Sequence, residues 1–347
     1  MDFLQDNSFI GKGSINKLQE VIANSKNILI FTGNTIFEKI KDITVPLLKG
    51  KNIDFYNDFS TNPNILELQK ALNSINKNYD TIIAVGGGSV IDFAKLYKYE
   101  TKSNAFFIAI PTTAGSGSQA TKFAVCFVDG KKKSIESDNL LPNIAIVDPQ
   151  FLKDSPRYLK ACCAFDALSQ SIESFWSIYS TPLSRKYALA SLELCKDNIV
   201  SFVNSEDEKS AYNMALAAHL SGKAINISKT TVAHALSYVF NVKYNIAHGH
   251  AVALSFARAF EANVNIAPQD LLDKRGADFY KNISNTLKSM FNKDYFRNLF
   301  MQIGLETNLT KLGIKNISDL VKEVNLERLS NNPRKFTFKE LENLFFI

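Results

Sequence analysis

Cysteine is scarce in this 347-residue sequence, and no run of apolar residues is long enough to cross a membrane as a helix. The four cysteines include the adjacent pair Cys162 and Cys163, which rarely forms a disulfide, and there is no Cys-x-x-Cys motif. The first residues, Met-Asp-Phe-Leu-Gln-Asp, lack the basic and apolar regions of a signal peptide. We therefore expect reduced thiols, a cytoplasmic location and no membrane association.

The sequence also lacks a concentration of charge. The net charge is +6, but the basic residues are spread along the chain, and residues 131–133 (Lys-Lys-Lys) are the one short run. This distribution argues against a nucleic-acid surface, although it suits an anionic cofactor or substrate. Apolar residues make up 46% of the chain and charged residues 21%, a balance that fits an ordinary enzyme, and the length favours two domains.

Short apolar segments rich in β-branched residues alternate with helical patterns in the first part of the chain. We predict strands at residues 27–32, 52–56, 81–85, 105–110 and 144–147, the last closing the sheet, a helix at 63–76, and a hairpin of 122–128 and 132–137 around Asp129-Gly130. After about Pro156 the strand patterns nearly vanish, and long helical patterns follow, for example at residues 182–202 and 210–225. The sequence thus predicts a doubly wound α/β domain over residues 1–156 and an all-helical domain over residues 157–347.

A glycine turn follows the strand at residues 81–85. Gly86, Gly87, Gly88 and Ser89 connect this strand to a helical pattern that begins at Val90. Such a turn presents backbone N–H groups at the positive end of a helix, and the missing Cβ atoms let a pyrophosphate approach the main chain. Three glycines alone also fit a simple tight turn, so this signal is weak by itself.

A second loop rich in glycine and hydroxyl groups, residues 111–121 (Pro-Thr-Thr-Ala-Gly-Ser-Gly-Ser-Gln-Ala-Thr), follows the next strand. Its side chains suit phosphate oxygens and a ribose, although it also fits a polar loop that caps the next element. Two such loops after two strands are better explained by a dinucleotide at the carboxyl edge of an open α/β sheet. The spacing is not that of the G-x-G-x-x-G fingerprint.

The two motifs together, G-G-G-S-x-x-D-x-A-K and P-T-T-A-G-S-G-S, resemble those of the iron-containing (group III) alcohol dehydrogenases. This family shares its fold with dehydroquinate synthase and glycerol dehydrogenase, and the resemblance covers nearly the whole chain. It implies reduction of an aldehyde with NAD(P)H at a metal that polarises the aldehyde oxygen. By analogy with the family, we also expect a homodimer or a larger oligomer.

The resemblance makes Asp166, His234 and His248 ligands of a divalent metal, Fe²⁺ or alternatively Zn²⁺. Gln170 and Tyr238 stand where the family usually has histidines. One carboxylate and two imidazoles still suffice for such a metal, and Gln170, one helical turn after Asp166, is placed to coordinate weakly or to hold a water. The alternative is that His234 and His248 are structural histidines.

The cofactor contacts that we expect are Gly33, Asn34, Gly86, Gly87, Gly88, Ser89, Asp92, Thr112, Thr113, Ser116 and Lys132. Relatives that prefer NAD often carry an acidic residue at about Gly33, where a carboxylate would repel a 2′-phosphate. Because this chain has glycine there, followed by Asn34 and Thr35, we expect NADPH rather than NADH.

Residues 166–174, 226–231 and 248–250, together with the ending 328–333, look like those of a subgroup that reduces phosphonoacetaldehyde to 2-hydroxyethylphosphonate. Lys229, Thr230 and Thr231 form a cationic, hydroxyl-rich cluster that suits an anionic aldehyde, although a helix cap with a surface lysine explains them equally well. His250 is a candidate proton shuttle or substrate contact, or a support for the metal site, and Tyr238 is a further candidate proton donor.

Three other functions remain open at this stage. One is a general iron-containing alcohol dehydrogenase that acts on neutral alcohols. Another is a lyase like dehydroquinate synthase, which uses the same fold with bound NAD, although residues 111–118 favour a dehydrogenase. The third is a relative that kept the fold without enzyme activity, which the departures at Gln170 and Tyr238 would allow. Net oxidation of NADPH by simple aldehydes distinguishes the dehydrogenases from the other two.

Overall fold

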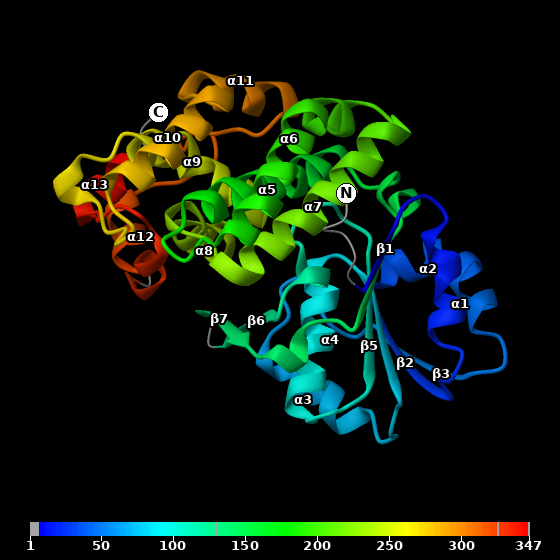
Figure 1. The fold of residues 1–347 in the computed structure, drawn as a ribbon. Helices are drawn as coiled ribbons and strands as arrows, with labels where there is room; N and C mark the ends of the chain where they lie inside the picture. Colours follow the sequence, from blue (N-terminus) through cyan, green and yellow to red (C-terminus); the bar gives the residue numbers. More distant parts are fainter. Residues whose placement is uncertain (1–6, 129–130, 325, 346–347) are drawn as a thin grey trace. The chain divides into compact units, whose positions relative to one another are not determined.

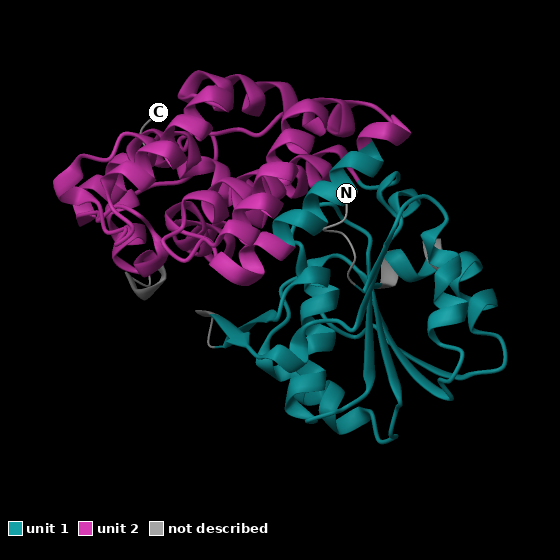
Figure 2. Cartoon of the chain, viewed as in Figure 1, with its two compact units in different colours: residues 1–155, 211–222 teal, residues 156–210, 223–347 magenta. Residues whose placement is uncertain are grey.

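The computed structural model describes residues 7–128, 131–324 and 326–345. Contacts between residues divide it into two compact units (Figure 2). The first comprises residues 1–155 together with 211–222, and the second comprises residues 156–210 together with 223–347. The domain boundary near residue 156 stays a prediction from the sequence, since compactness alone does not define a functional domain.

Six parallel strands form the sheet of the first unit, in the order β1-β8-β5-β4-β2-β3. Figure 1 labels β1, β5, β2 and β3 of this sheet. Their bounds are β1 Ser8–Ile10, β2 Asn27–Thr32, β3 Asn52–Tyr56, β4 Thr81–Gly86, β5 Phe106–Pro111 and β8 Ile144–Val147. The α-helices of this unit are α1 Lys17–Val21, α2 Asn34–Thr44, α3 Ile65–Ser74 and α4 Gly88–Glu100, and residues 211–222 of α7 (Glu208–Ser228) also belong to it. Parallel strands alternating with helices confirm the α/β class expected from the sequence.

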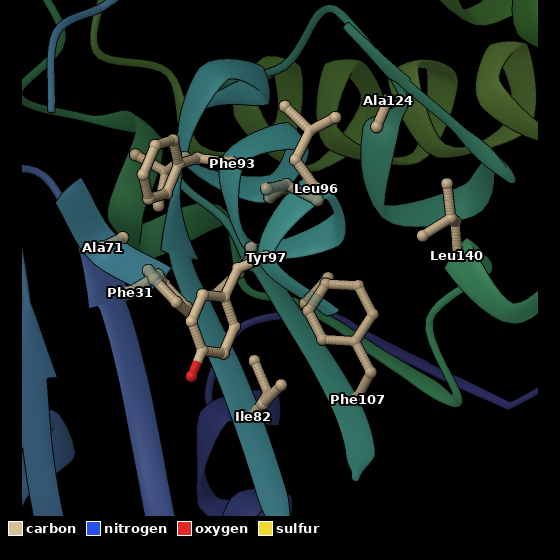
Figure 3. Close-up of a cluster of buried hydrophobic side chains, with 14 of the residues drawn as sticks. Phe31, Ala71, Ile82, Phe93, Leu96, Tyr97, Phe107, Ala124 and Leu140 are labelled. Carbon is tan, nitrogen blue, oxygen red and sulfur yellow. The ribbon is translucent and has the colours of Figure 1, made fainter. Parts of the chain in front are cut away.

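Both faces of this sheet are buried, and successive strand residues point alternately to the two sides. Leu29, Phe31, Ile82 and Phe107 pack on the side covered by α3 and α4, and Figure 3 shows Phe31 beside Phe93 and Tyr97 of α4. Their neighbours in the strands, Ile28, Ile30, Ile83 and Ile108, pack on the other side, against α1 and the turn before it. Continuous apolar strands of this kind are typical of a parallel sheet covered on both faces.

Two details of the strands differ from the sequence prediction. Strand β1 was not predicted, because it has only three residues and all of them are partly exposed. It pairs with β8, so β8 lies inside the sheet instead of closing it. The predicted hairpin is present as a separate antiparallel pair, β6 Phe123–Val128 and β7 Lys131–Glu136, but its turn, Asp129-Gly130, lies outside the described residues.

The two predicted glycine loops meet at one edge of the sheet. Strands β4 and β5 are neighbours, and Gly86 lies opposite Pro111 in their register. The backbone N–H of Thr112 donates to the carbonyl of Gly86 at 3.0 Å. The loops that follow these strands therefore start side by side.

Apart from the isolated bridge between Leu271 and Arg334, the regular structure described after residue 156 is helical, as predicted. The helices are α5 Arg157–Trp176, α6 Pro182–Asn204, α7 Glu208–Ser228, α8 Val232–Tyr244, α9 His248–Val264, α10 Ala277–Met290, α11 Lys293–Ile303, α12 Ile317–Lys322 and α13 Phe338–Asn343. Thr181 and Thr337 start α6 and α13 with capping boxes, in which the threonine side chain accepts from a backbone N–H one turn later. Within the described residues, no helix has the length and apolar character that a membrane span requires.

Candidate functional site

Three side chains that were expected to bind a metal lie together in the second unit. Asp166 comes from the middle of α5, His234 from the first turn of α8, and His248 begins α9. One ligand atom of each lies within 4.8 Å of the others. The distances to Asp166 Oδ1 are 3.2 Å from His234 Nε2 and 3.8 Å from His248 Nε2. A carboxylate and two imidazoles at this spacing fit a divalent metal, which is the donor set of many Zn²⁺ and Fe²⁺ sites.

His234 is held from its other ring nitrogen by Glu173, a buried residue of α5. The distance from His234 Nδ1 to Glu173 Oε2 is 2.6 Å. Burial alone would lower the pKa of His234, but the carboxylates of Glu173 and Asp166 together raise it to about 9. The ring therefore faces negative charge on both sides, an environment that favours a bound cation, either a proton or a metal ion.

His248 is held by the close approach of α9 to α5. A Cβ atom on Gly249 would lie 1.9 Å from the carbonyl oxygen of Cys162, so only glycine fits at this position. Ser237 Oγ donates to the carbonyl of His234 at 2.8 Å and lies 3.3 Å from His248 Nδ1. This contact places the ring hydrogen of His248 on Nδ1, and its Nε2 faces Asp166 Oδ1.

The two residues that depart from the family pattern also lie at this cluster. Gln170 follows Asp166 by one turn of α5 and is buried. Tyr238 follows His234 by one turn of α8, and its ring stacks on that of His248 with 5.9 Å between centroids. Tyr238 thus contacts one expected metal ligand, and Gln170 lies one helical turn from another.

His250 is buried and uses both ring nitrogens. Its Nε2 donates to the carbonyl of Glu306 at 2.6 Å, so its Nδ1 accepts from the hydroxyl of Tyr158 at 2.9 Å. Burial lowers the pKa of His250, which keeps the ring neutral and this arrangement intact. Its contacts are those of a structural support, and a role as proton shuttle would require one of these bonds to exchange. Tyr158 was not identified from the sequence.

The segment from Lys229 to Thr231 links α7 to α8. Lys229 is exposed and has φ +61° and ψ 177°, a conformation that side chains rarely adopt. The carbonyl of Thr230 accepts from Asn331 Nδ2 at 3.2 Å, and Thr231 Oγ1 accepts from Trp176 Nε1 at 2.8 Å. These bonds anchor the segment, and the lysine side chain lies at the surface.

The glycine turn in the first unit leaves no room for side chains. A Cβ atom on Gly86 would meet the side chain of Val90 at 2.5 Å, and one on Gly88 would meet Ser116 Oγ at 2.6 Å. Gly87 would meet Thr113 at 3.3 Å. Helix α4 starts here with no acidic residue in its first turn, so its N-terminus is a suitable place for an anion.

Among the loop residues expected at the cofactor, Thr112 has a hydroxyl that is buried and has no hydrogen-bond partner. A buried hydroxyl without a partner is uncommon, and a polar ligand bound at this loop would supply one. Ser89 Oγ donates to the carbonyl of Thr61 at 2.5 Å. Asp92 accepts from Ser118 Oγ and, at 3.2 Å, from the backbone N–H of Val125, so its carboxylate braces the second loop.

Lys95, which the sequence analysis did not single out, also holds the second loop. Its ammonium group is fully buried and donates to the carbonyls of Ser118, Thr121 and Phe123 at 2.7, 2.7 and 2.8 Å. Burial lowers its pKa to about 8, although the carboxylate of Asp92 opposes the shift. A lysine on a helix is usually exposed, so its sequence position gave no sign of a buried role.

Gly33, at the end of β2, precedes the first residue of α2, and the first turn of that helix contains no acidic residue. Neither position 33 nor the first turn of α2 therefore carries an acidic side chain at this edge of the sheet. The side chains of Asn34 and Lys132, which were also expected at the cofactor, lie outside the described residues.

Family models match nearly the whole chain. The model described as "Iron-containing alcohol dehydrogenase" matches residues 6–149, and "Fe-containing alcohol dehydrogenase family, C-terminal" matches residues 160–346.

Individual relatives are more distant. The chain is 29% identical to long-chain-alcohol dehydrogenase 1 of Geobacillus thermodenitrificans over 71% of its length and 69% of the relative's. It is 26% identical to phosphonoacetaldehyde reductase of Streptomyces viridochromogenes, over 90% of this chain and 86% of the other. Among solved structures, sulfoacetaldehyde reductase from Bifidobacterium kashiwanohense in complex with NAD⁺ is similar with a TM-score of 0.85 and 26% identity, covering 98% of this chain and 96% of that one.

Proposed function

The chain belongs to the iron-containing alcohol dehydrogenase family of oxidoreductases, and we propose that it reduces a short anionic aldehyde to its primary alcohol with NADPH. Phosphonoacetaldehyde, which would give 2-hydroxyethylphosphonate, is the substrate that we propose first. The cluster of Asp166, His234 and His248 carries the proposal, because it offers a carboxylate and two imidazoles for one metal. A divalent metal bound there, Fe²⁺ or alternatively Zn²⁺, would supply Lewis-acid polarisation of the aldehyde oxygen.

The first unit supplies the features that suit the cofactor. The N-terminus of α4, the bare glycine turn and the orphaned Thr112 hydroxyl suit the pyrophosphate and a ribose hydroxyl. Position 33 is glycine, so no carboxylate at this position would repel the 2′-phosphate of NADPH, and this supports NADPH as the cofactor. The cofactor would deliver a hydride to the carbonyl carbon, and the protein would orient it.

Two features support an anionic substrate. Phosphonoacetaldehyde reductase and sulfoacetaldehyde reductase, two of the relatives, are both named for an acetaldehyde that carries an anionic group. In this chain Lys229 is exposed in the segment that leads into α8, five residues before His234. We assign this lysine to the anionic group of the substrate, and Tyr238, stacked on His248, to the proton that the alcohol oxygen receives.

The decisive experiment is a substrate comparison with the purified protein loaded with Fe²⁺ or Zn²⁺. Oxidation of NADPH is followed at equal concentrations of phosphonoacetaldehyde, sulfoacetaldehyde and propanal, and repeated with NADH. We expect the highest kcat/KM with NADPH and an anionic aldehyde. A preference for propanal would indicate a general alcohol dehydrogenase, and no net oxidation with any aldehyde would contradict the proposed reduction.

A further inference from the structure

We propose that Glu173 is a positioning residue that sets the orientation and the metal affinity of His234. This inference rests on the proposed metal site and deepens it. Glu173 lies seven residues after Asp166, and therefore about two turns further along the same face of α5. One helix thus supplies both the expected carboxylate ligand and the carboxylate that holds the imidazole ligand.

The carboxylate of Glu173 is completely buried and accepts three hydrogen bonds from the start of α8. Its Oε2 accepts from the backbone N–H of Thr231 at 2.7 Å and faces His234 Nδ1 at 2.6 Å. Its Oε1 accepts from the backbone N–H of Ala233 at 2.8 Å. Two of the donors are backbone N–H groups at a helix N-terminus, where such groups have no acceptor within the helix. This end of a helix favours negative charge.

These contacts decide which ring nitrogen of His234 carries the hydrogen. Glu173 accepts at Nδ1, so that nitrogen keeps its hydrogen, and Nε2 faces Asp166 Oδ1, 3.2 Å away, where it can bind either a proton or a metal ion. A metal ligand needs this tautomer and this orientation. A carboxylate at the far nitrogen also makes the imidazole a stronger base towards a metal.

A second tie at the same place allows the orientation of the ring to be separated from the fold. Trp176, three residues after Glu173 on α5, donates from Nε1 to the hydroxyl of Thr231 at 2.8 Å. This bond also joins α5 to the start of α8, but it does not touch the imidazole. The loss of Glu173 should therefore free the ring of His234 while Trp176 still holds the helix.

The test compares Glu173→Gln with Trp176→Phe in the full-length protein. Gln keeps the shape of Glu173 but removes its charge and turns an NH₂ group towards one or two of the three donors. Phe removes the tie to Thr231 together with part of the buried indole ring, and it leaves Glu173 in place. We expect Glu173→Gln to lower the affinity for Zn²⁺, measured by competition with a chromophoric chelator, by 10- to 100-fold. Trp176→Phe should lower the thermal midpoint and leave Zn²⁺ affinity within about twofold of the wild type.

A metal-free readout keeps this inference separate from the proposed function. In ¹⁵N-labelled protein without metal, the Nδ1–H of His234 should give a strongly downfield-shifted proton signal, which Glu173→Gln moves upfield or removes and Trp176→Phe retains. Glu173→Asp, which keeps the charge but is one methylene shorter, serves if the Gln variant does not fold, and it too should remove the signal.

An unchanged signal and unchanged Zn²⁺ affinity in a folded Glu173 variant would overturn the inference. Wild-type protein that shows the signal but binds no metal would contradict the proposed function and leave the orientation of His234 established.

Discussion

The carbonyl oxygen of Cys162 on α5 occupies the space next to Gly249 on α9, only 1.9 Å from where a Cβ atom would stand. The carbonyl oxygen belongs to the backbone and a Cβ atom is fixed directly to it, so neither can move without shifting a helix. Because Gly249 directly follows His248, this contact fixes where the first residue of α9 presents its imidazole. The close packing of two helices is therefore a condition for the ligand geometry.

Gly249→Ala should damage both stability and the metal site. The added methyl group forces α9 away from α5, and overpacking of this kind costs about 1–3 kcal/mol or more of unfolding free energy. Urea denaturation and zinc content by elemental analysis measure the two effects. Gly276→Ala is the matched control, because a Cβ there meets nothing within 4 Å, although its positive φ adds some strain. Equal zinc content in the two variants would contradict the packing argument.

His248→Ala should lose bound metal with the fold intact. The variant removes one of three candidate ligands from a side chain that is already 30% exposed, so little packing is lost. Elemental analysis after dialysis reads out the metal, and circular dichroism reads out the fold. His219→Gln, which changes a buried histidine that is not part of this cluster, should retain the metal. Unchanged metal content in His248→Ala would falsify the assignment of this ligand.

The sequence predicted the central strands well because their apolar runs are local signals. Residues 27–32 and 52–56 were predicted with the bounds that the structure shows, whereas β1 has only three residues and is recognisable as a strand only through its pairing with β8. Pairing partners far apart in the chain cannot be inferred from a single short segment.

At the candidate metal site, the three ligands expected from the sequence, Asp166, His234 and His248, lie together. The residues that support such sites were not predicted. Glu173 lies within residues 166–174, but the sequence did not predict a role for it. The first backbone group that donates to its carboxylate, at Thr231, lies 58 residues later in the chain. Lys95 was missed for a similar reason, since its acceptors lie in a loop more than 20 residues away. Supporting residues of this kind depend on tertiary contacts, which carry no local periodicity.

Lys95→Met should destabilise the first unit and disorder the second glycine-rich loop. Three backbone carbonyls lose a buried donor, and each buried unsatisfied acceptor costs about 1–3 kcal/mol. We expect a lower unfolding midpoint in urea and weaker NADPH binding by fluorescence titration. Lys77→Met, at a lysine whose side chain is 70% exposed, is the control and should change neither quantity.

The pH dependence of stability should also report Lys95. Its pKa is lowered to about 8 in the folded protein, below the value of about 10.4 for an unfolded lysine, so the unfolded state binds more protons between these values. Wild-type stability should therefore rise relative to Lys95→Met as the pH increases from 7 to 10. Using the difference between the two proteins cancels the titration of other groups. A constant difference across this range would show that the ammonium keeps its ordinary pKa.

Gly33→Asp should reverse the coenzyme preference. A carboxylate at the N-cap of α2 would repel the 2′-phosphate of NADPH and could accept hydrogen bonds from the ribose of NADH. We expect a rise in KM for NADPH of about tenfold or more, with NADH spared. Gly33→Asn, which has the same shape without the charge, separates repulsion from steric effects. If the unmodified protein already uses NADH as well as NADPH, the preference inferred from Gly33 is wrong.

Lys229→Ala should reduce kcat/KM for phosphonoacetaldehyde by about tenfold or more, because a charge-assisted bond to the substrate anion is worth about 1.5–3 kcal/mol. It should barely affect propanal, which has no anionic group to bind.

Lys229 has a backbone conformation, φ +61° and ψ 177°, that glycine adopts more easily, so Lys229→Gly removes the same charge and relieves the strain. An equal loss of phosphonoacetaldehyde activity in both variants would assign the effect to the charge. Recovery of activity in the glycine variant, or an equal loss with propanal, would instead assign Lys229 to the backbone geometry before α8 and remove the physical support for an anionic substrate.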